Sequence, residues 1–351
     1  MRILHIIKNF DFGGAENHLC TLANSLDLIG NEIILIGGRG TQQSRLNSSI
    51  TFIPLRLRSV LFLYNLIRIV YFVLRYNIQV IHAHQRYPIH LASIVGKLTG
   101  RPVILTVHGR SQYDLRSGFS RKMASKIIFV SQFVLENSIR FPEIQSKVVY
   151  IPNGVTLPSK IPLKISHQIC YISRMDSKHS AVVRMIIKQV LPRLLMDYPL
   201  LTFNIVGGGR HLEEVKVDAE RFNQACNKVV CLVSGFKSDV MESVRQSILV
   251  LGVGRVALEA LACGVPVLSV NRKRLGTLIT RDNYSFYKAN NFVAVGQNPP
   301  EAETLLAQIQ LYFSNLAYFQ KETDVLQLLV DEEFNSLKIA NSIHEIYKEL
   351  I

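Results

Sequence analysis

One short segment, residues 247–270, constrains the fold of this chain more than any other. Its first part, residues 247–251, is an apolar run typical of a buried strand, and two glycines end that strand. Good helix-forming residues follow at 255–263, and a glycine and a proline then end the predicted helix. Residues 265–270 are apolar again and predict a second buried strand. Strand, glycine turn, helix and strand in this order form one unit of a parallel α/β sheet.

The turn inside this segment can bind an anion. The backbone N–H groups of Gly254, Arg255 and Val256 would lie at a helix N-terminus, where they can hold a phosphate or diphosphate. Glu259 lies one turn further along and has no basic residue four positions after it. Its carboxylate could accept hydrogen bonds from sugar hydroxyls, or it could be a solvated residue on a structural helix. The segment alone leaves both interpretations open.

Composition and charge predict two globular domains of unequal charge. A chain of 351 residues with 48% hydrophobic residues is long enough to form two cores. Its five cysteines have no metal-type spacing, and their odd number without a signal peptide favours free thiols in a reducing cytosol. Residues 1–160 carry a net charge of +12, whereas residues 161–351 carry +2. The first half should therefore face an acidic partner or an anionic surface. No nucleic-acid-binding motif is present, so nucleic acid is not expected.

The strand–helix alternation runs through both halves of the chain. In the first half, apolar strands are predicted at 2–7, 33–37, 80–84, 103–107, 126–130 and 148–151. In the second half they are predicted at 169–173, 201–206, 229–232, 247–251, 265–270 and 292–295. A polar stretch with two prolines, residues 156–166, separates the halves as a linker. The pattern predicts two α/β domains with a ligand cleft between them.

Several strands end in residues suited to a site. Gly13 and Gly14 follow the first strand and let the backbone approach a ligand, or they form an ordinary tight turn. The third glycine of the dinucleotide fingerprint is missing, which disfavours a dehydrogenase. His82, His84 and His108 end two further strands. His82 and His84 point to one face, but no carboxylate or cysteine stands nearby, so a metal is not expected. His108 could equally be structural.

The most membrane-like stretch, residues 60–74 of a helix predicted at 60–76, is too short and too polar to span a bilayer. Arg56, Arg58, Arg68 and Arg75 flank or interrupt it. It is either a helix buried on the sheet or an interfacial patch that docks on anionic lipid.

In order along the chain, nine short motifs resemble those of the retaining nucleotide-sugar glycosyltransferases of family 4. The motifs are Gly13–Glu16, His82–His84, Thr106–His108, Phe129–Ser131, Ile151–Val155, Ser173-Arg174 with Lys178, Val206–Gly209, Gly235-Phe236 with Asp239, and Glu259–Val267. The family has the GT-B fold, an α/β architecture of two Rossmann-like domains that face each other across a cleft. The resemblance implies an acceptor-binding domain at 1–157, a donor-binding domain at 166–334, and a final helix at 335–351 that crosses back to the first domain.

The resemblance also implies roles for individual residues. Arg174 and Lys178 would neutralise the donor diphosphate, Glu259 would bind the ribose hydroxyls, and His108 would lie near the transferred sugar. Further contacts with the donor would come from Gly13, Gly14, Gly208, Phe236, Gly254, Arg255 and Val256.

The chain departs from the family pattern at one important position. The family usually has two glutamates eight positions apart, and the first holds the hydroxyls of the donor sugar. Leu251 stands at that position here, which puts the identity of the donor sugar in doubt. The spacing from Arg174 to Lys178 is also one residue short of the commonest form.

Together these features predict a hexosyltransferase that moves a sugar from a nucleotide diphosphate sugar to an acceptor hydroxyl with retention. No metal or other cofactor is expected. The acceptor is expected to be an anionic or lipid-linked glycan, in bacterial cell-surface polysaccharide synthesis. The protein is expected to be cytoplasmic and peripheral to the inner face of the membrane. Two alternatives stay open: a non-catalytic nucleotide-sugar-binding protein and a GT-B-fold nucleotide-sugar epimerase.

Overall fold

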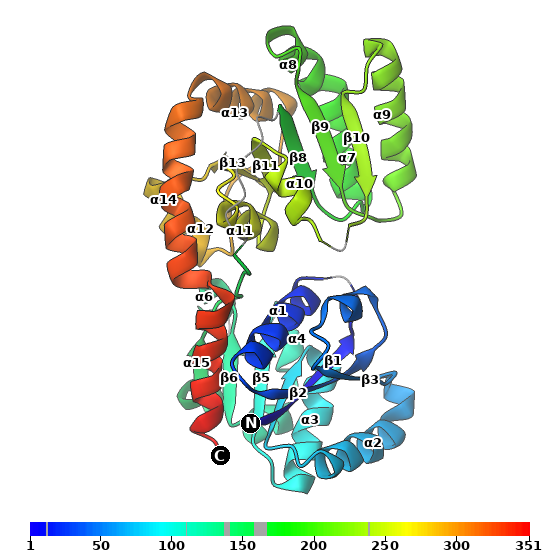
Figure 1. Cartoon of the computed structure of the whole chain (residues 1–351), viewed down its shortest axis with the longest axis vertical. Helices are drawn as coiled ribbons and strands as arrows, with labels where there is room; N and C mark the ends of the chain where they lie inside the picture. The colour runs from blue at the N-terminus through cyan, green and yellow to red at the C-terminus, as the bar shows by residue number, and fades with distance from the viewer. Residues whose placement is uncertain (12, 110, 137–140, 158–166, 238) are drawn as a thin grey trace. The chain divides into compact units, whose positions relative to one another are not determined.

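The computed structural model describes residues 1–11, 13–109, 111–136, 141–157, 167–237 and 239–351, which form two compact α/β units (Figure 1). The first unit consists of Met1–Thr156 and Phe334–Ile351, and the second of Leu157–Glu333. Most of the predicted linker, residues 158–166, lies outside the described residues.

The first unit is built on a parallel sheet of seven strands in the order β3-β2-β1-β4-β5-β6-β7. The strands are β1 (Arg2–Asn9), β2 (Glu32–Gly38), β3 (Thr51–Pro54), β4 (Val80–His84), β5 (Val103–Val107), β6 (Lys126–Phe129) and β7 (Val148–Tyr150). The helices are α1 (Gly14–Leu28), η1 (Thr41–Arg45), η2 (Ser59–Leu61), α2 (Phe62–Arg75), α3 (Arg86–Thr99), α4 (Ser111–Asp114), α5 (Gly118–Met123), α6 (Gln132–Glu136), η3 (Pro142–Lys147) and α15 (Ser336–Lys348).

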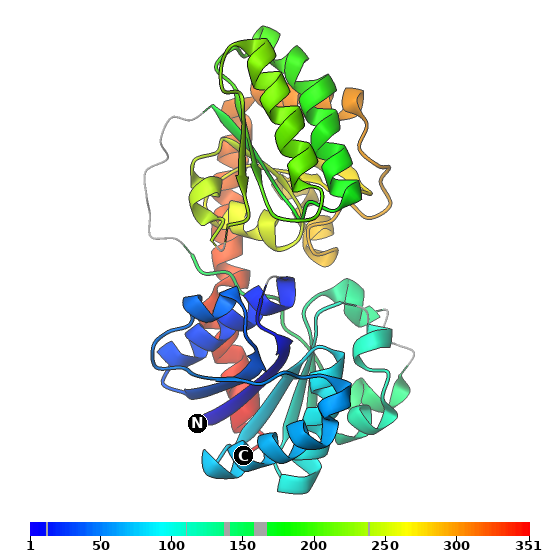
Figure 2. The same ribbon diagram turned by 90° about the vertical axis from the view of Figure 1, so that its right-hand side faces the viewer.

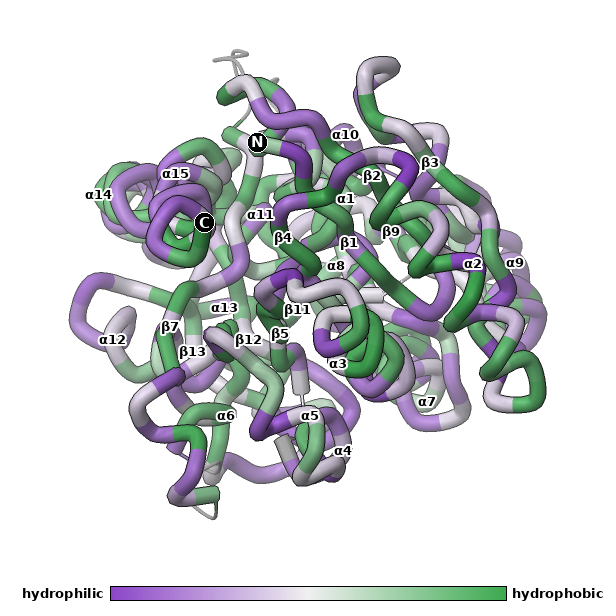
Figure 3. Tube along the Cα trace, turned by 90° about the horizontal axis from the view of Figure 1, so that it is seen from below, coloured by the Kyte–Doolittle hydropathy of each residue, from purple (hydrophilic) through white to green (hydrophobic). Residues whose placement is uncertain are grey.

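Alternate residues of these strands face two different core layers, because successive side chains of a strand point to opposite faces. One layer packs strand residues such as Ile3 and Val80 against α1 and the C-terminal helix α15. The other layer packs Leu4 and Ile81 against α2 and α3. Figure 3 shows hydrophobic residues along β5, and every residue of β4 and β5 is buried, whichever face its side chain points to. Burial on both faces is typical of a parallel sheet covered on both sides.

The second unit is built on a six-stranded sheet in the order β10-β9-β8-β11-β12-β13, in which only β13 is antiparallel. The strands are β8 (Gln168–Ile172), β9 (Thr202–Val206), β10 (Cys231–Gly235), β11 (Leu249–Gly252), β12 (Val267–Val270) and β13 (Leu275–Leu278). The helices are α7 (Ser177–Met185), η4 (Ile186–Val190), α8 (Leu191–Asp197), α9 (Leu212–Cys226), α10 (Met241–Arg245), α11 (Arg255–Ala262), α12 (Arg281–Ala289), α13 (Ala302–Ser314) and α14 (Leu316–Phe334). Figure 2 shows α7 and α9, in green, side by side on one face of this sheet.

The two predicted parallel α/β domains are confirmed, with three local differences. The strand predicted at 292–295 is wrong: the segment is a turn, in which Phe292 has φ +57 and its carbonyl accepts a hydrogen bond from Ser269. Phe292 and Ala294 are buried, whereas Val295 is exposed, and this alternation explains the strand-like pattern of the segment. The last strand is instead β13. The helix that the strand–helix alternation predicts after the first strand of this unit contains a π-helical turn, η4.

Helix α2 is buried on only one side. Asn65, Ile69, Phe72 and Val73 face the protein. The opposite side is also apolar but exposed, and it continues from η2: Val60, Leu63, Tyr64, Ile67, Tyr71 and Leu74. Helix α2 therefore packs on the sheet, as one interpretation of its sequence expected, but only with one side, and its other apolar side stays exposed. Among the described residues, no helix is both long enough and apolar enough to cross a bilayer.

Candidate functional site

The second sheet reverses its strand order between β8 and β11. From β8 the chain continues to β9 on one side, and from β11 it continues to β12 on the other side. In open α/β sheets such a reversal leaves a crevice at the carboxyl ends of the two strands, where ligands bind. The loop after β8 carries Arg174 and leads to Lys178, whereas the loop after β11 carries Gly254. The topology thus places both predicted diphosphate contacts at one edge of one sheet.

The turn after β11 requires a glycine at its last position. Gly254 has φ +61 and ψ −131, a conformation that other residues rarely adopt, and no side chain caps the helix that follows it. Helix α11 then begins at Arg255. The N-terminus of α11 therefore presents backbone N–H groups and the positive end of the helix dipole to the crevice.

Glu259 has a basic partner that the sequence analysis did not anticipate. The partner lies four residues before it: Arg255 Nε donates to Glu259 Oε1 at 2.7 Å, and both side chains are almost buried. The spacing of four residues between Arg255 and Glu259 on one helix is the signal in the sequence that indicates this pair. Among the described residues, Glu259 Oε2 has no hydrogen-bond partner, and it is the oxygen left for a ligand. The pair holds the carboxylate in one orientation, as a positioned hydroxyl acceptor would need.

Arg174 and Lys178 are exposed, and neither forms an ion pair with any described residue. Asp176 lies between them and caps α7 by accepting from the backbone N–H groups of Lys178 and His179. It also accepts from Arg272 Nη1 at 2.9 Å, which ties the basic loop after β12 to the same edge. Partial burial raises the pKa of Asp176, but hydrogen bonds from His179 outweigh it, and the net pKa is lowered. Asp176 and Arg272 were not predicted as site residues.

The glycine loop after β9 packs directly between its neighbours. Gly207 has φ +143, and a Cβ there would lie 1.7 Å from the Ser173 carbonyl oxygen. A Cβ on Gly208 would lie 3.1 Å from the Cβ of Phe236, so these two predicted donor contacts are adjacent. The Gly208 carbonyl also accepts from the N–H of Met175 at 3.0 Å. The loops after β8, β9 and β10 therefore form one connected surface.

Leu251 is a core residue. It lies in β11, pairs with Tyr171 and Leu268, and is completely buried in the hydrophobic core of the second unit. The chain thus has an aliphatic side chain where the family usually has the first glutamate.

The first sheet reverses its strand order between β1 and β4. Gln85, at φ +69, bridges the loops there: its Nε2 donates to Glu16 Oε1 at 2.6 Å, and its Oε1 accepts from the Lys8 N–H at 3.3 Å. Gly13 and Gly14 begin α1 beside this bridge, and a Cβ on Gly13 would lie 2.1 Å from Glu16 Oε2. A side chain at position 13 would therefore meet the end of the Glu16 side chain, which Gln85 holds by a hydrogen bond. Gln85 was not predicted from the sequence.

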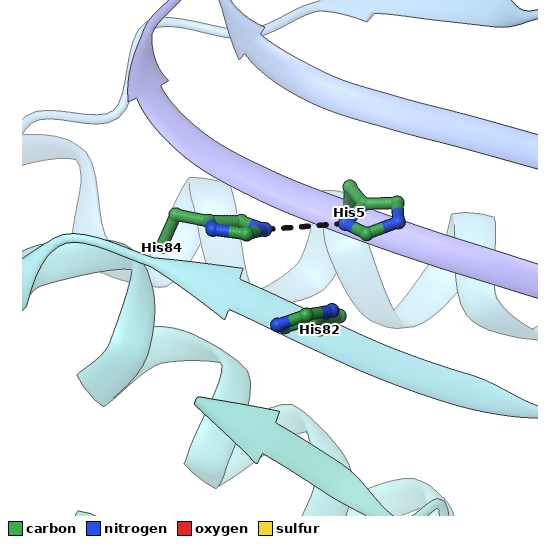
Figure 4. A group of neighbouring side chains, drawn as sticks. All are labelled: His5, His82 and His84. Atoms are coloured by element: carbon green, nitrogen blue, oxygen red, sulfur yellow. Dashed lines mark hydrogen bonds between the residues drawn. The ribbon is translucent and has the colours of Figure 1, made fainter. Parts of the chain in front are cut away.

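Three of the five clustered histidines of the first unit form a hydrogen-bonded chain. His5 Nδ1 lies 3.2 Å from His84 Nε2, and His84 Nδ1 lies 3.1 Å from His108 Nε2. Figure 4 shows the first of these bonds, with the His82 ring stacked on His84. His18, on α1, lies edge-on to His108 with ring centroids 5.0 Å apart. The strand register explains the cluster, because His5 is paired with His82 and both face the layer under α1 and α15.

Burial keeps these histidines neutral. It lowers the pKa of His5 and of His108 to about 3, and it lowers the pKa of His82 and His84 well below their usual value. A neutral imidazole has one donor and one acceptor nitrogen, so the tautomers along the chain are linked. If His108 Nε2 accepts a hydrogen bond from His84, then Nδ1 of His108 carries the proton and is a donor. If His108 Nε2 instead donates to His84, then Nδ1 of His108 is an acceptor. His84 and His5 thus set what His108 offers to a ligand.

Two groups of these histidines bring nitrogens close enough for a metal: His5, His82 and His84, and His18, His84 and His108. The first group is poorly suited to a metal ion, because both ring nitrogens of His82 already form hydrogen bonds. Nδ1 lies 2.7 Å from Tyr347 Oη, and Nε2 lies 2.6 Å from Thr106 Oγ1. Neither group includes a carboxylate to offset a divalent charge in a buried site. A hydrogen-bonded chain of neutral imidazoles accounts for the geometry.

Asp114 is a further titratable group beside His108. Its carboxylate accepts from the backbone N–H of His108, and burial raises its pKa to about 6. It lines a cavity of about 800 Å³ together with Lys8, Arg86 and Arg116. A carboxyl group with a raised pKa in a cavity is a candidate for proton transfer. No motif in the sequence indicated Asp114.

Two family models match the chain. The model described as Glycosyltransferase Family 4 matches residues 12–157, and the model described as Glycosyl transferases group 1 matches residues 166–302. No curated protein sequence matches the chain.

Solved structures with the same fold cover nearly the whole chain. HepE of Anabaena, in complex with UDP and glucose, has a TM-score of 0.75 at 18% identity, with 100% of both chains covered. A glycosyltransferase of Rickettsia africae has a TM-score of 0.74 at 20% identity, covering 99% of this chain and 98% of the other. A protein of Listeria monocytogenes that is described as a UDP-N-acetylglucosamine 2-epimerase has a TM-score of 0.69 at 12% identity, covering 99% of this chain and 95% of the other.

The first matched segment covers most of the first unit, the second lies within the second unit, and the solved structures share the two-unit fold over nearly the whole chain. The chain therefore belongs to the family 4 glycosyltransferases of the GT-B fold.

Proposed function

We propose that this protein transfers a sugar, with retention of configuration, from a nucleoside diphosphate sugar to an acceptor hydroxyl. The observation that carries the proposal is the edge of the second sheet at β8 and β11. There Arg174, Lys178 and the uncapped N-terminus of α11 can stabilise a diphosphate, while Glu259 holds one oxygen ready for a hydroxyl. HepE was solved with UDP, and we extend this donor class to the present chain.

The chemistry follows from the leaving group. The bond between the anomeric carbon and the diphosphate oxygen breaks, and the acceptor oxygen forms a new bond on the same face of the sugar. Negative charge develops on the diphosphate as it leaves, and two cations and a helix N-terminus can stabilise that charge without a metal. The acceptor proton passes to the departing diphosphate. His108, with its tautomer set by His84, positions the sugar.

The first unit is proposed to bind the acceptor at a membrane surface. The exposed apolar side of α2 carries Leu63 and Ile67, which are 70% and 68% exposed, next to several arginines. Apolar side chains beside basic residues are typical of helices that lie in the interface of an anionic membrane. The proposal therefore includes a location at the inner face of the cell membrane and a role in the synthesis of a surface glycan, and the exposed apolar side of α2 supports the membrane contact.

Binding of UDP tests the donor site. We expect UDP to raise the melting temperature of the wild type and to have little effect on Glu259→Gln. The matched control is Glu220→Gln, which removes an exposed carboxylate from α9 and should respond like the wild type. Equal stabilisation of both variants would refute the assigned role of Glu259, and no stabilisation of the wild type by any nucleotide would refute the donor site.

Two other functions are favoured by specific observations. Leu251 in the core supports a protein that binds a nucleotide sugar without transferring it. The likeness to the Listeria epimerase supports an epimerase of the same fold. Incubation with UDP-sugars separates the three: transfer or slow hydrolysis releases UDP, epimerisation changes the sugar while it stays attached, and a binding protein leaves the donor intact.

A further inference from the structure

The first unit contains a basic cavity that none of the roles above explains. Its volume is about 800 Å³, and four cationic residues line it: Lys8, Arg39, Arg56 and Arg58. None of the described residues that line this cavity is acidic. Four like charges around one hollow repel one another, so the arrangement is most stable when an anion lies among them.

The fold brings these cations together from three adjacent strands. Lys8 lies near the end of β1, Arg39 directly follows β2, and Arg56 and Arg58 follow β3. The three strands are parallel neighbours, so their carboxyl ends meet at the same edge of the sheet. Open α/β sheets bind ligands at this edge.

None of the four cations forms an ion pair with a described residue. All four are exposed. Elsewhere in the described chain, arginines such as Arg184 and Arg281 have carboxylate partners. The cations of the cavity are therefore available to a ligand.

The segment that carries two of the arginines is fixed by polar contacts. The side chain of Asn65, buried in α2, donates to the carbonyls of Arg56 and Arg58 at 3.3 and 3.4 Å. Tyr87 Oη donates to the Arg58 carbonyl at 3.0 Å. An ordered backbone reduces the entropy that the two arginines lose on binding a ligand.

The basic cavity is continuous in sequence with an exposed apolar surface. Val60, two residues after Arg58, is 86% exposed, and the exposed apolar side of α2 follows it. A ligand that satisfies both features has a multiply charged anionic group attached to an apolar chain.

We propose that the cavity binds the phosphate or diphosphate group of a lipid-linked acceptor. This inference rests on the proposed function, because it assumes that an acceptor binds to the first unit. Arginine forms bidentate hydrogen bonds with phosphate oxygens, and a diphosphate offers enough oxygens for several cations at once. The same chemistry would accept a free diphosphate, so the two sources must be distinguished by experiment.

The first experiment measures binding of inorganic pyrophosphate by calorimetry at low salt. Every protein in the series carries Arg174→Gln, which weakens the proposed donor diphosphate site so that the cavity dominates the signal. Adding Arg56→Gln and Arg58→Gln should weaken binding at least about tenfold, because two charged hydrogen-bond donors are lost. The control adds Arg75→Gln and Arg221→Gln, two exposed arginines outside the cavity that give the same change in charge. Equal affinity in both variants would overturn the proposal.

The second experiment identifies the source of the phosphate. Phosphatidylcholine vesicles with a polyisoprenyl diphosphate are compared with vesicles of equal charge that contain phosphatidylglycerol. If the ligand is a lipid-linked acceptor, the protein should bind the vesicles with polyisoprenyl diphosphate more tightly than those with phosphatidylglycerol. The variant with Arg56→Gln and Arg58→Gln should lose this preference. Binding of pyrophosphate in solution without any preference among vesicles would overturn the lipid source.

Failure of the cavity and failure of the donor site give different results. In a chain with native Arg174, the Arg56→Gln and Arg58→Gln variant should bind UDP as the wild type does. If the wild type fails to bind UDP, the proposed function is wrong, whereas the pyrophosphate result still decides whether the cavity binds phosphate.

Discussion

Burial of His5 should make the stability of the first unit depend strongly on pH. His5 is completely buried, and its pKa is lowered from 6.5 to about 3 by burial. The unfolded chain binds a proton at this position below pH 6.5, but the folded protein does not until the pH approaches 3. The stability from a neutral His5 is therefore fully present above pH 6.5 and is lost progressively as the pH falls towards 3.

The size of the effect follows from that difference in pKa. For His5 alone, the free energy of unfolding should fall by about 1.4 kcal/mol at pH 5.5 and by about 2 kcal/mol at pH 5. His82 and His84, which lie beside His5, shift in the same direction and add to the loss. His108 shifts in the same direction as well, but it is only partly buried and so should add less. Against a total stability of roughly 5–15 kcal/mol, this is a large fraction.

Urea unfolding between pH 7 and 5, followed by circular dichroism, tests this reasoning. The chain has no tryptophan, so fluorescence is the weaker probe. We expect His5→Phe to lose about 2 kcal/mol less stability than the wild type over this range, whatever its absolute stability. The control is His167→Phe, because His167 is exposed, and it should leave the pH dependence unchanged. A wild-type stability that stays constant from pH 7 to 5, or an imidazole of His5 that gains a proton near pH 6.5 by NMR, would refute the argument.

Three further results are expected. Tyr347→Phe removes the hydroxyl that forms a hydrogen bond with His82 Nδ1, so a buried nitrogen loses its partner. The free energy of unfolding in urea should fall by about 1–3 kcal/mol. An unchanged midpoint of urea unfolding would contradict this hydrogen bond. Gly207→Ala forces a Cβ against the Ser173 carbonyl oxygen at a positive φ, and it should lower the free energy of unfolding in urea by about 1–3 kcal/mol or more. The control is Gly109→Ala, because a Cβ at position 109 would enter open space. Leu63→Ser with Ile67→Ser should weaken binding to anionic vesicles in a sedimentation assay while the melting temperature stays the same; unchanged binding would exclude α2 as the docking surface.

The edge of the second sheet at β8 and β11 shows how closely the sequence predicts local structure. Residues 247–270 predicted a strand, a glycine turn, a helix and a strand, and the structure has β11, α11 and β12 there. The prediction worked because the glycines and the proline act on the backbone within a few residues. The partner of Glu259 is also local, since Arg255 lies one turn before it, and the spacing of four residues is visible in the sequence.

The histidine chain, the basic cavity and Asp114 could not be predicted in the same way. His5 and His84 are 79 positions apart, and their contact depends on β1 pairing with β4, which no local pattern fixes. The cavity depends on the order β3-β2-β1, which brings the ends of three strands to one edge. The pKa of Asp114 depends on burial, which is set by packing.

The sequence by itself determined the two α/β units, most of their strands and helices, and the motifs of the family, because hydrophobic periodicity and glycine or proline breaks act over short distances. Only the tertiary structure decided which strand ends meet, and hence that His108 ends a chain of neutral histidines and that four cations surround one cavity. The physical reason is that charge and proton affinity depend on neighbours in space, which only the folded sheet brings together.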